Sequence, residues 1–254
     1  MDQDLKAYFA KTLAEVSIDC VIFGFHAGEL KVLLLRWKET DGWSLPGGRI
    51  FKEESLNAAA VRILQERTGL TEIFLHQYYT FGDTNRNTHF TEMELLERLE
   101  GFFGKGIFDE LLHNRVVSVG YFALVEFALV QATPDWFTDE CRWWNIADVP
   151  NLLFDHNDMI TSALQALRQQ IRNQPIGYDL LPEKFTMPEL QKLYETILDK
   201  QFDRRNFQKL LMSYDILEKL DEKRVGVANK SPFLYRFDKQ KYEKAIHSGI
   251  SFSM

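Results

Sequence analysis

The chain has few cysteines, and the two present do not form a closely spaced pair. Among 254 residues only Cys20 and Cys141 occur. A disulfide framework needs several cysteines at short spacing, and a structural zinc site needs paired cysteines or histidines. The six histidines include no His-x-x-x-His pair. We therefore expect two free, buried thiols, and neither a disulfide scaffold nor a zinc site.

The chain also has no long hydrophobic run. The longest, from Val116 to Val130, is interrupted by Ser118 and Glu126, whereas a membrane span needs about 20 apolar residues. The first residues carry acidic side chains and do not follow the basic-then-apolar order of a secretory signal. We therefore expect a cytoplasmic protein with no membrane partner.

What the chain does have is an uneven distribution of charge. Its formal net charge is −7, with 30 Lys and Arg against 37 Asp and Glu. Residues 184–244 hold 14 basic and 10 acidic residues, so the remainder holds 16 and 27. A basic tail on an acidic body indicates a polyanionic partner.

The first two thirds of the sequence alternate strand-like and helix-like segments. Apolar residues spaced by four predict a short amphipathic helix at residues 4–16 and a longer helix at 157–172. Segments rich in Val, Ile, Leu and Phe predict strands at 18–25, 30–37, 72–81, 115–129 and 142–145. The first two are joined by four residues that include Gly28, which is typical of a β-hairpin. We expect the strand at 115–129 to be central in a sheet.

The most specific motif is the stretch from Trp43 to Leu70, which begins W-S-L-P-G-G and ends R-I-L-Q-E-R-T-G-L. It resembles the Nudix signature, a loop–helix–loop that normally carries a divalent metal over a pyrophosphate. Ser55 is placed to cap the helix, and Gly69 to end it. The positions that fit the family pattern are Gly48, Glu54, Arg62, Leu64, Glu66, Gly69 and Leu70.

Two positions of the signature depart from the pattern. Ile63 and Arg67 stand where the family has glutamates. Residues 63, 66 and 67 share one helical face, so only Glu66 of three expected carboxylates remains there. Magnesium requires oxygen ligands, and metal-assisted attack on a pyrophosphate requires that ion. We therefore expect no cofactor and no catalytic residues, unless Glu53 or Glu54 substitutes as a ligand.

Residues 84–114 form an apolar and acidic insertion that the related sequences replace by a shorter connection. Because so many apolar side chains must be buried, three roles are open: a helical cap on the same domain, a dimer surface, or a lid over the ligand site.

The pattern changes after a Pro- and Gly-containing linker at residues 173–185. Thr186 and Glu189 form a capping box that opens one helix. A four-residue turn at 199–202 follows, and Asp203 is placed to cap a second helix with apolar residues at 207, 210, 211 and 214. Residues 216–220 and 234–237 can pair as strands around a basic loop. A helix, a tight turn, a basic helix and a basic hairpin are typical of a winged helix-turn-helix.

The polar face of the second helix suits a duplex, because Arg and Gln reach base edges while Lys and Arg hold phosphates. We expect the DNA contacts to come from this helix and from the loop. The candidates are Arg204, Arg205, Asn206, Gln208, Lys209, Arg224 and Lys230. Two alternatives remain, namely that these cations form an ordinary solvated face, or that the tail binds a protein.

The chain resembles the Nudix-related transcriptional regulators, a family that includes repressors of NAD metabolism and of arabinose use. The resemblance rests on motifs that occur in the same order, namely the degenerate signature, Leu153-Phe154-Asp155-His156 and Asp203-Arg-Arg-Asn-Phe207. The resemblance implies an α+β protein with a Nudix-like α/β/α sandwich and a C-terminal winged helix. We expect a Nudix-like sensing domain at 1–172, the linker at 173–185 and a DNA-binding domain at 186–254.

The resemblance also implies a homodimeric, ligand-controlled repressor that binds a double-stranded operator and senses a sugar or nucleotide-sugar in the former substrate cleft. The candidate effector contacts are Arg36, Arg49, Glu66, Arg67, Asp83, Arg86, Ser118 and Tyr121. The alternative function is a Nudix hydrolase that cleaves a nucleoside diphosphate derivative, with Glu54 and Glu66 on magnesium.

Overall fold

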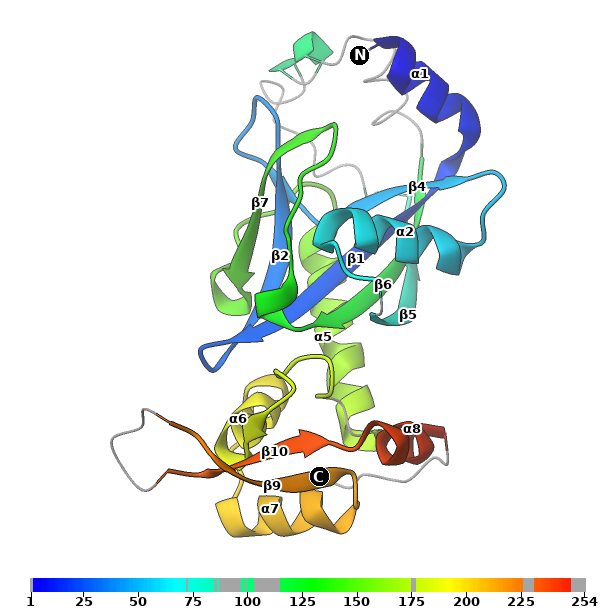
Figure 1. The fold of residues 1–254 in the computed structure, drawn as a ribbon. Coiled ribbons are helices and arrows are strands. Elements are labelled where there is room, and N and C mark those ends of the chain that lie inside the picture. Colours follow the sequence, from blue (N-terminus) through cyan, green and yellow to red (C-terminus); the bar gives the residue numbers. More distant parts are fainter. Residues whose placement is uncertain are drawn as a thin grey trace. The chain divides into compact units, whose positions relative to one another are not determined.

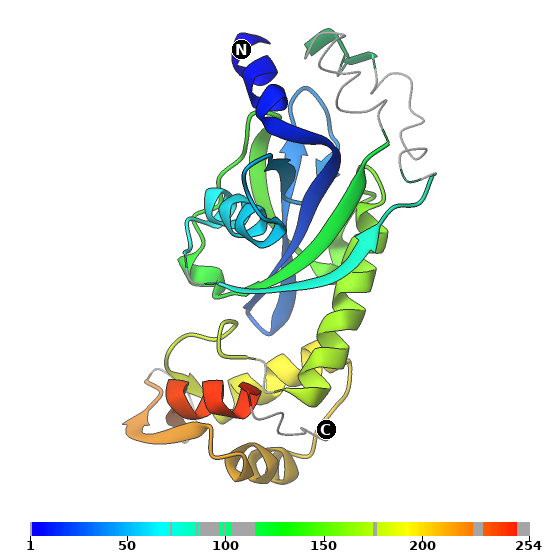
Figure 2. The same cartoon turned by 90° about the vertical axis from the view of Figure 1, so that its right-hand side faces the viewer.

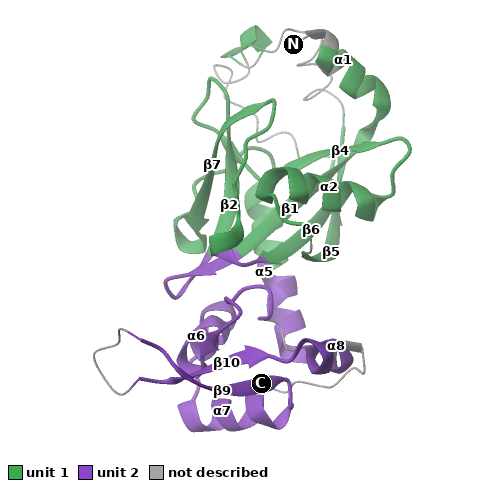
Figure 3. Ribbon diagram, in the orientation of Figure 1, with its two compact units in different colours: residues 1–23, 31–124, 128–163 green, residues 24–30, 125–127, 164–254 purple. Residues whose placement is uncertain are grey.

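A computed structural model of the chain describes residues 2–71, 73–84, 86, 97–98, 100–102, 115–174, 177–225 and 231–247. The chain divides into two compact units, which Figure 3 distinguishes by colour. Unit 1 comprises residues 1–23, 31–124 and 128–163, and unit 2 comprises residues 24–30, 125–127 and 164–254. The division falls within helix α5 (His156–Asn173), and the predicted boundaries at 172 and 186 stay predictions.

Unit 1 is built on a seven-stranded sheet (Figure 1). Five strands lie in the order β3 (Trp43–Ser44), β2 (Glu29–Trp37), β1 (Thr12–His26), β6 (Val117–Val125) and β5 (Phe74–Phe81). In addition, β4 (Gly47–Phe51) pairs with β1, and β7 (Thr138–Asn145) pairs with β2. The predicted central strand is confirmed, because β6 lies between β1 and β5 and is buried along nearly its whole length.

The predicted hairpin is confirmed as β1 and β2. Its two turn residues, Ala27 and Gly28, have φ angles of 53° and 79°. Positive φ at both central positions matches the right-handed twist of paired strands. The middle of β1, from Cys20 to Phe23, has no exposed surface, which explains why this strand is a continuous apolar run without alternation.

Two helices cover the sheet of unit 1. Helix α2 (Leu56–Thr68) lies on one face, and the first part of α5 lies on the other (Figures 1 and 2). The predicted caps of α2 are both present: the Ser55 hydroxyl accepts from the Ala58 N–H at 3.2 Å, and Gly69 has a left-handed φ of 74°. This layering confirms the predicted α/β/α sandwich.

The predicted N-terminal helix at 4–16 is wrong in its second half. Helix α1 covers Asp2–Lys11, and β1 begins at Thr12. Thr12 pairs with Phe51 of β4 and is 3% exposed, while Leu13 is 39% exposed. Pairing with a strand distant in sequence therefore outweighs the local helical spacing.

Unit 2 contains the predicted winged helix. Helices α6 (Met187–Leu198) and α7 (Arg204–Ser213) are followed by an antiparallel wing of β9 (Leu217–Lys223) and β10 (Phe233–Phe237). The short strand β8 (Phe185–Thr186) pairs with the other edge of β10, and α8 (Lys239–His247) follows. Strand β9 extends three residues beyond the predicted end at residue 220.

Side-chain caps fix the first residues of helices α6 and α7. The Thr186 and Glu189 side chains each accept from the backbone N–H of the other residue, which completes the predicted capping box. Asp203 caps α7 by accepting from the N–H groups of Arg205 and Asn206 at 3.1 and 2.9 Å. The core between α6 and α7 includes Tyr194 edge-on to Phe207, with ring centroids 5.5 Å apart.

Several expectations concern residues outside the described part of the chain. These are most of the insertion at 84–114 and the tip of the wing, including Lys230. Both cysteines are described and are free; Cys20 is buried and Cys141 is half-buried. None of the described helices is long and apolar enough to cross a membrane.

Candidate ligand cavity and nucleic-acid interface

The signature loop brings α2 close to the centre of the sheet. The Cys20 N–H donates to the Pro46 carbonyl at 2.8 Å, which holds the Pro-Gly-Gly turn against β1. A Cβ atom at Gly47 would lie 2.8 Å from the Ile18 carbonyl, closer than real Cβ atoms approach. Glycine is therefore required at position 47 for this close approach of two backbones.

The residues at the metal positions of the signature do not fit magnesium. Ile63 is 1% exposed and offers no oxygen, and the Arg67 guanidinium adds a positive charge beside Glu66. The described residues contain no group of three or more His, Cys, Asp or Glu side chains able to hold a metal. Magnesium prefers near-octahedral oxygen ligation, and this helical face offers it one carboxylate beside a positive charge.

Glu54, the alternative metal ligand, is already engaged. Its two carboxylate oxygens accept from Arg62 at 2.6 and 3.1 Å, and one also accepts from the Phe51 N–H at 2.8 Å. Burial raises the pKa of Glu54, but these hydrogen bonds outweigh burial and lower that pKa below its usual value. Arg62 further donates to the Arg49 carbonyl at 2.9 Å, so this pair ties α2 to β4.

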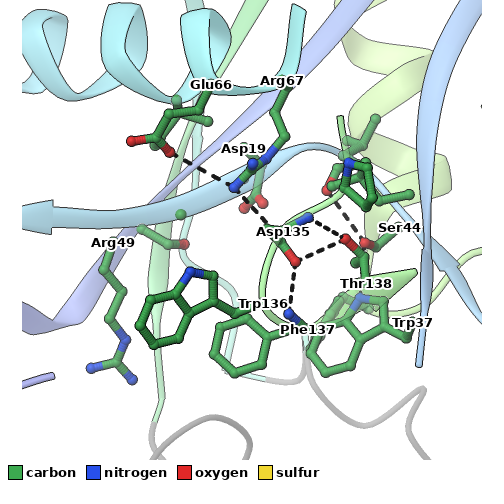
Figure 4. Close-up of a pocket in the computed structure, with 18 of the residues that line it drawn as sticks. Asp19, Trp37, Ser44, Arg49, Glu66, Arg67, Asp135, Trp136, Phe137 and Thr138 are labelled. Carbon is green, nitrogen blue, oxygen red and sulfur yellow. Dashed lines mark hydrogen bonds and ion pairs between the residues drawn. The ribbon is translucent and has the colours of Figure 1, made fainter. Parts of the chain in front are cut away.

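A cavity of about 670 Å³ lies within unit 1 beneath this helix. Aromatic rings form much of its wall: Tyr8, Phe9, Trp37, Phe51, Trp136, Phe137 and Phe154. Figure 4 shows Trp136, Phe137 and Trp37 in a row, with the Glu66–Arg67–Asp135 cluster on one side of them. The volume suits a ligand of nucleotide size, because small-molecule sites of about 300–1,000 Å³ are usual.

Four of the eight predicted effector residues line this cavity, namely Arg49, Glu66, Arg67 and Arg86. The Arg49 guanidinium lies 4.6 Å from the centroid of the Phe9 ring. Arg86 is bound on several sides: it holds Asp155 at 2.8 and 3.1 Å and donates to the Val116 carbonyl at 3.0 Å. The buried Arg86–Asp155 pair therefore supports the cavity wall.

The other four predicted effector residues do not line the cavity. Arg36 binds Asp139 at 3.0 Å on the surface, and Asp83 is exposed. The Tyr121 hydroxyl donates to Asn57 at 2.8 Å, while Ser118 donates to Asp19. The Nudix layout suggested that these residues lie near the cleft, but Arg36 and Tyr121 are paired away from the cavity. Ser118 reaches the cavity only through Asp19, which itself lines it.

Asp19 links Ser118 to a second buried polar residue, His156. The His156 Nδ1 accepts from the Leu45 N–H at 2.9 Å, and its Nε2 lies 3.6 Å from Asp19. Burial lowers the pKa of His156 despite the nearby carboxylates of Asp19 and Asp155. His156 is therefore neutral at pH 7 and joins the signature loop to the start of α5.

Several cavity residues are absent from the sequence-based candidates. Tyr8 and Phe9 come from α1, and the Tyr8 hydroxyl accepts from the Arg49 N–H at 3.3 Å. Asp135, Trp136 and Phe137 precede β7; the Asp135 carboxylate accepts from the Phe137 N–H at 2.9 Å, which shapes that loop. The sequence signal for these residues is weak: an unusual Asp-Trp-Phe cluster precedes the strand at 138–145, and no motif marks Tyr8 or Phe9.

The predicted DNA-contacting residues lie mainly on one helix of unit 2. On α7, Arg204, Arg205, Asn206 and Lys209 are exposed, while Phe207 and Leu211 are buried. The helix therefore presents a cationic, hydrogen-bonding side to solvent, as a recognition helix requires. Gln208 is half-buried, and its amide lies 3.5 Å from the Tyr235 hydroxyl.

The predicted wing contact Arg224 has an intramolecular partner. Its guanidinium donates to both carboxylate oxygens of Glu189 at 2.8 and 2.6 Å. Glu189 belongs to the capping box of α6, so this ion pair fixes the base of the wing to the start of that helix. Both side chains remain partly exposed.

Comparison with known proteins assigns both units. Residues 14–163 match the family model of the NUDIX domain, and residues 177–237 match that of the NrtR DNA-binding winged helix domain. The ADPR responsive transcriptional repressor NtrR of Acinetobacter baylyi is 28% identical over 236 residues, which cover 90% of this chain and 84% of that protein.

Two solved structures are similar to most of this chain. The crystal structure of Shewanella oneidensis NrtR complexed with a 27mer DNA has a TM-score of 0.71 and 26% identity, over 90% of this chain and 95% of that one. A second crystal structure of Shewanella oneidensis NrtR has a TM-score of 0.70 and 27% identity, over 89% and 95%. The chain therefore belongs to the Nudix family, and within it to the Nudix-related transcriptional regulators that carry an NrtR-type winged helix.

Proposed function

We propose that this chain is a transcriptional repressor whose Nudix domain binds ADP-ribose or a closely similar nucleoside diphosphate sugar, and whose winged helix binds an operator. The observation that carries the proposal is the cavity of unit 1, where aromatic rings and arginines line one space and two of the three signature carboxylates are replaced by Ile63 and Arg67. The name of the Acinetobacter baylyi relative supports ADP-ribose as the ligand.

The cavity suits the two chemical parts of such a ligand. Trp136, Phe137 and Trp37 offer ring faces for an adenine base, and Trp37 and Phe137 lie 6.1 Å apart with nearly parallel planes. Arg49 and Arg67 offer guanidinium groups, which bind phosphate oxygens with two parallel hydrogen bonds. A neutral sugar would use the rings but not the arginines, so we favour a charged nucleotide-sugar.

On the DNA side, we propose that Arg205 and Lys209 of α7 contact the duplex. Both are exposed on a helix whose opposite side is buried against α6. Two copies of the chain would place two such helices about 34 Å apart, one helical turn of DNA, so we propose a cytoplasmic homodimer on a two-fold symmetric operator. Ligand binding must favour the dimer geometry with the lower operator affinity, because a ligand that binds both geometries equally well does not change their populations.

The test of DNA binding starts from duplexes selected from a random pool by the purified protein. Fluorescence anisotropy at several salt concentrations should then show binding that Arg205→Ala and Lys209→Ala each weaken about tenfold or more, since a lost base or phosphate contact costs about 1–3 kcal/mol. Lys244→Ala, an exposed cation on α8, is the matched control and should bind normally. Equal binding by all three variants would instead favour a protein partner for this surface.

The test of the effector adds ADP-ribose to the protein–DNA complex. We expect release of the duplex at ligand concentrations near the Kd, and no release by ribose. Chromatography of the same samples with magnesium should show intact ADP-ribose. Steady formation of AMP, abolished by Glu66→Gln, would establish the hydrolase function instead.

A further inference from the structure

We propose that Arg67 takes the place of the divalent cation in this Nudix cavity, so that the diphosphate of the ligand binds a fixed guanidinium without magnesium. This inference rests on the proposed function, because it concerns how the same cavity holds the same ligand. It follows from the presence of Ile63 and Arg67 at two positions where the Nudix signature has glutamates.

The first observation behind this inference is the position of Arg67 on helix α2. Residues 63, 66 and 67 are spaced i, i+3 and i+4, so they share the helical face that carries the metal ligands in the family pattern. Arg67 lines the cavity and is 9% exposed. A positive charge is therefore built into the helix at the site where relatives with the full pattern gather carboxylates around a cation.

The guanidinium is held in place by two carboxylates. One terminal nitrogen of Arg67 lies 3.3 Å from Asp135 and 3.8 Å from Glu66 (Figure 4). The second Asp135 oxygen accepts from the Thr138 hydroxyl at 2.8 Å, so the loop before β7 fixes that carboxylate. The Arg67 carbonyl also accepts from the Thr133 N–H at 3.1 Å, which joins the same loop to the end of α2.

The guanidinium still has an unsatisfied donor. The Nε atom of Arg67 is buried and has no hydrogen-bond partner among the described residues. Buried N–H groups are nearly always paired, so an orphan donor on a residue that lines the cavity calls for an acceptor that the described residues do not supply. Phosphate oxygens accept from the Nε and a terminal nitrogen of one guanidinium together, whereas a lysine would act only as a point charge.

The decisive measurement is the affinity of the full-length protein for ADP-ribose by calorimetry, in magnesium and then in EDTA. We expect the two Kd values to agree within about twofold. A Kd raised about tenfold or more by EDTA would mean that a metal supplies about 1.4 kcal/mol or more of the binding energy, which overturns the inference.

Variants separate a ligand contact from a structural role. Arg67→Gln should weaken ADP-ribose binding about tenfold or more, because a charge-assisted bond to phosphate is lost. Adenosine, which has no phosphate, should bind the variant and the parent protein alike, and Arg67→Lys should recover part of the ADP-ribose affinity. Equal loss for both ligands would show that Arg67 only shapes the cavity. Melting curves identify a misfolded variant, and the EDTA comparison needs no variant.

The outcomes also separate this inference from the proposed function. Binding of ADP-ribose that requires magnesium leaves the effector intact and removes only the role of Arg67. If ADP-ribose does not bind in either buffer, the proposed effector fails, and inorganic pyrophosphate becomes the probe. Metal-independent pyrophosphate binding lost in Arg67→Gln would still support the role of Arg67, whereas no pyrophosphate binding would overturn it.

Discussion

At the scale of single residues, the arginines of unit 1 differ in what they contact. Arg62 and Arg86 hold partly or fully buried carboxylates and carbonyls, Arg36 makes a surface ion pair, and Arg67 carries a donor with no partner within the described part of the chain. Since the same residue type serves structure and the proposed ligand binding, only burial and partners distinguish the two roles.

Arg86→Ala should destabilise the protein rather than merely weaken ligand binding. The side chains of Arg86 and Asp155 are 6% and 11% exposed, so the substitution leaves a buried carboxylate without its cation. Such a loss costs about 3–5 kcal/mol of unfolding free energy. Urea denaturation followed by tryptophan fluorescence measures this, since four of the five tryptophans lie near the cavity or in β7.

Arg36→Ala is the matched control, because Arg36 also binds a carboxylate but with both side chains more than a third exposed. Exposed ion pairs contribute little to stability. A loss of stability as large as that of Arg86→Ala would contradict the distinction between the two sites.

At the scale of elements, the start of α7 depends on one side chain. The same Asp203 oxygen accepts from two backbone N–H groups that would otherwise lack partners. The adjoining residues Arg204, Arg205 and Asn206 are exposed and belong to the proposed DNA surface. The first turn of α7 thus combines a structural cap with side chains of the proposed DNA surface.

Asp203→Ala should lower the unfolding free energy by about 0.5–2 kcal/mol, the usual cost of losing an N-cap acceptor. Hydrogen exchange should rise in peptides from the first turn of α7. Asp203→Asn keeps the acceptor oxygen and should remain close to the parent protein. If both substitutions had the same effect, the negative charge and not the cap would be responsible.

At the scale of the whole molecule, the two units have ionisable groups with opposite responses to pH. In unit 1, the lowered pKa of buried His156 means that stability is lost as pH falls below about 6.5. In unit 2, burial raises the pKa of Asp179 to about 6, although Lys239 opposes the shift. A carboxyl with a raised folded-state pKa stabilises fully below its ordinary value of 3.8, and this contribution is lost as pH rises to about 6.

Asp179→Asn should therefore stabilise unit 2 at pH 7, because it removes a carboxylate that is costly to bury when charged. The gain should be much smaller at pH 4, where the folded-state carboxyl is protonated. Thermal melting at the two pH values measures the difference, and hydrogen exchange in α6 and α8 assigns it to unit 2. An equal gain at both values would exclude ionisation as the cause.

The fold was predictable wherever local signals determine it. The capping box at Thr186, the Asp203 cap and Gly69 fixed helix ends correctly, because each acts within four residues of the end it marks. The end of α1 was not predictable, because Thr12 pairs with Phe51, which is distant in sequence.

The candidate site was only half predictable, and for the same physical reason. The signature marked Glu66 and Arg67 directly, since the helix itself brings them to one face. Tyr8 and Asp135 enter the cavity from segments on either side of the signature, so tertiary packing alone assigns them. Arg224 likewise gave no sequence signal of its pairing with Glu189, 35 residues away.

The burial of Ile63 has a consequence for how this lineage can change. Its side chain packs against Gly48 inside the signature loop. A glutamate introduced there would have to leave water before any cation compensated its charge, so Ile63→Glu alone should lower the stability of unit 1. Restoring the full signature pattern would therefore demand repacking beside Gly48 and not only new carboxylates.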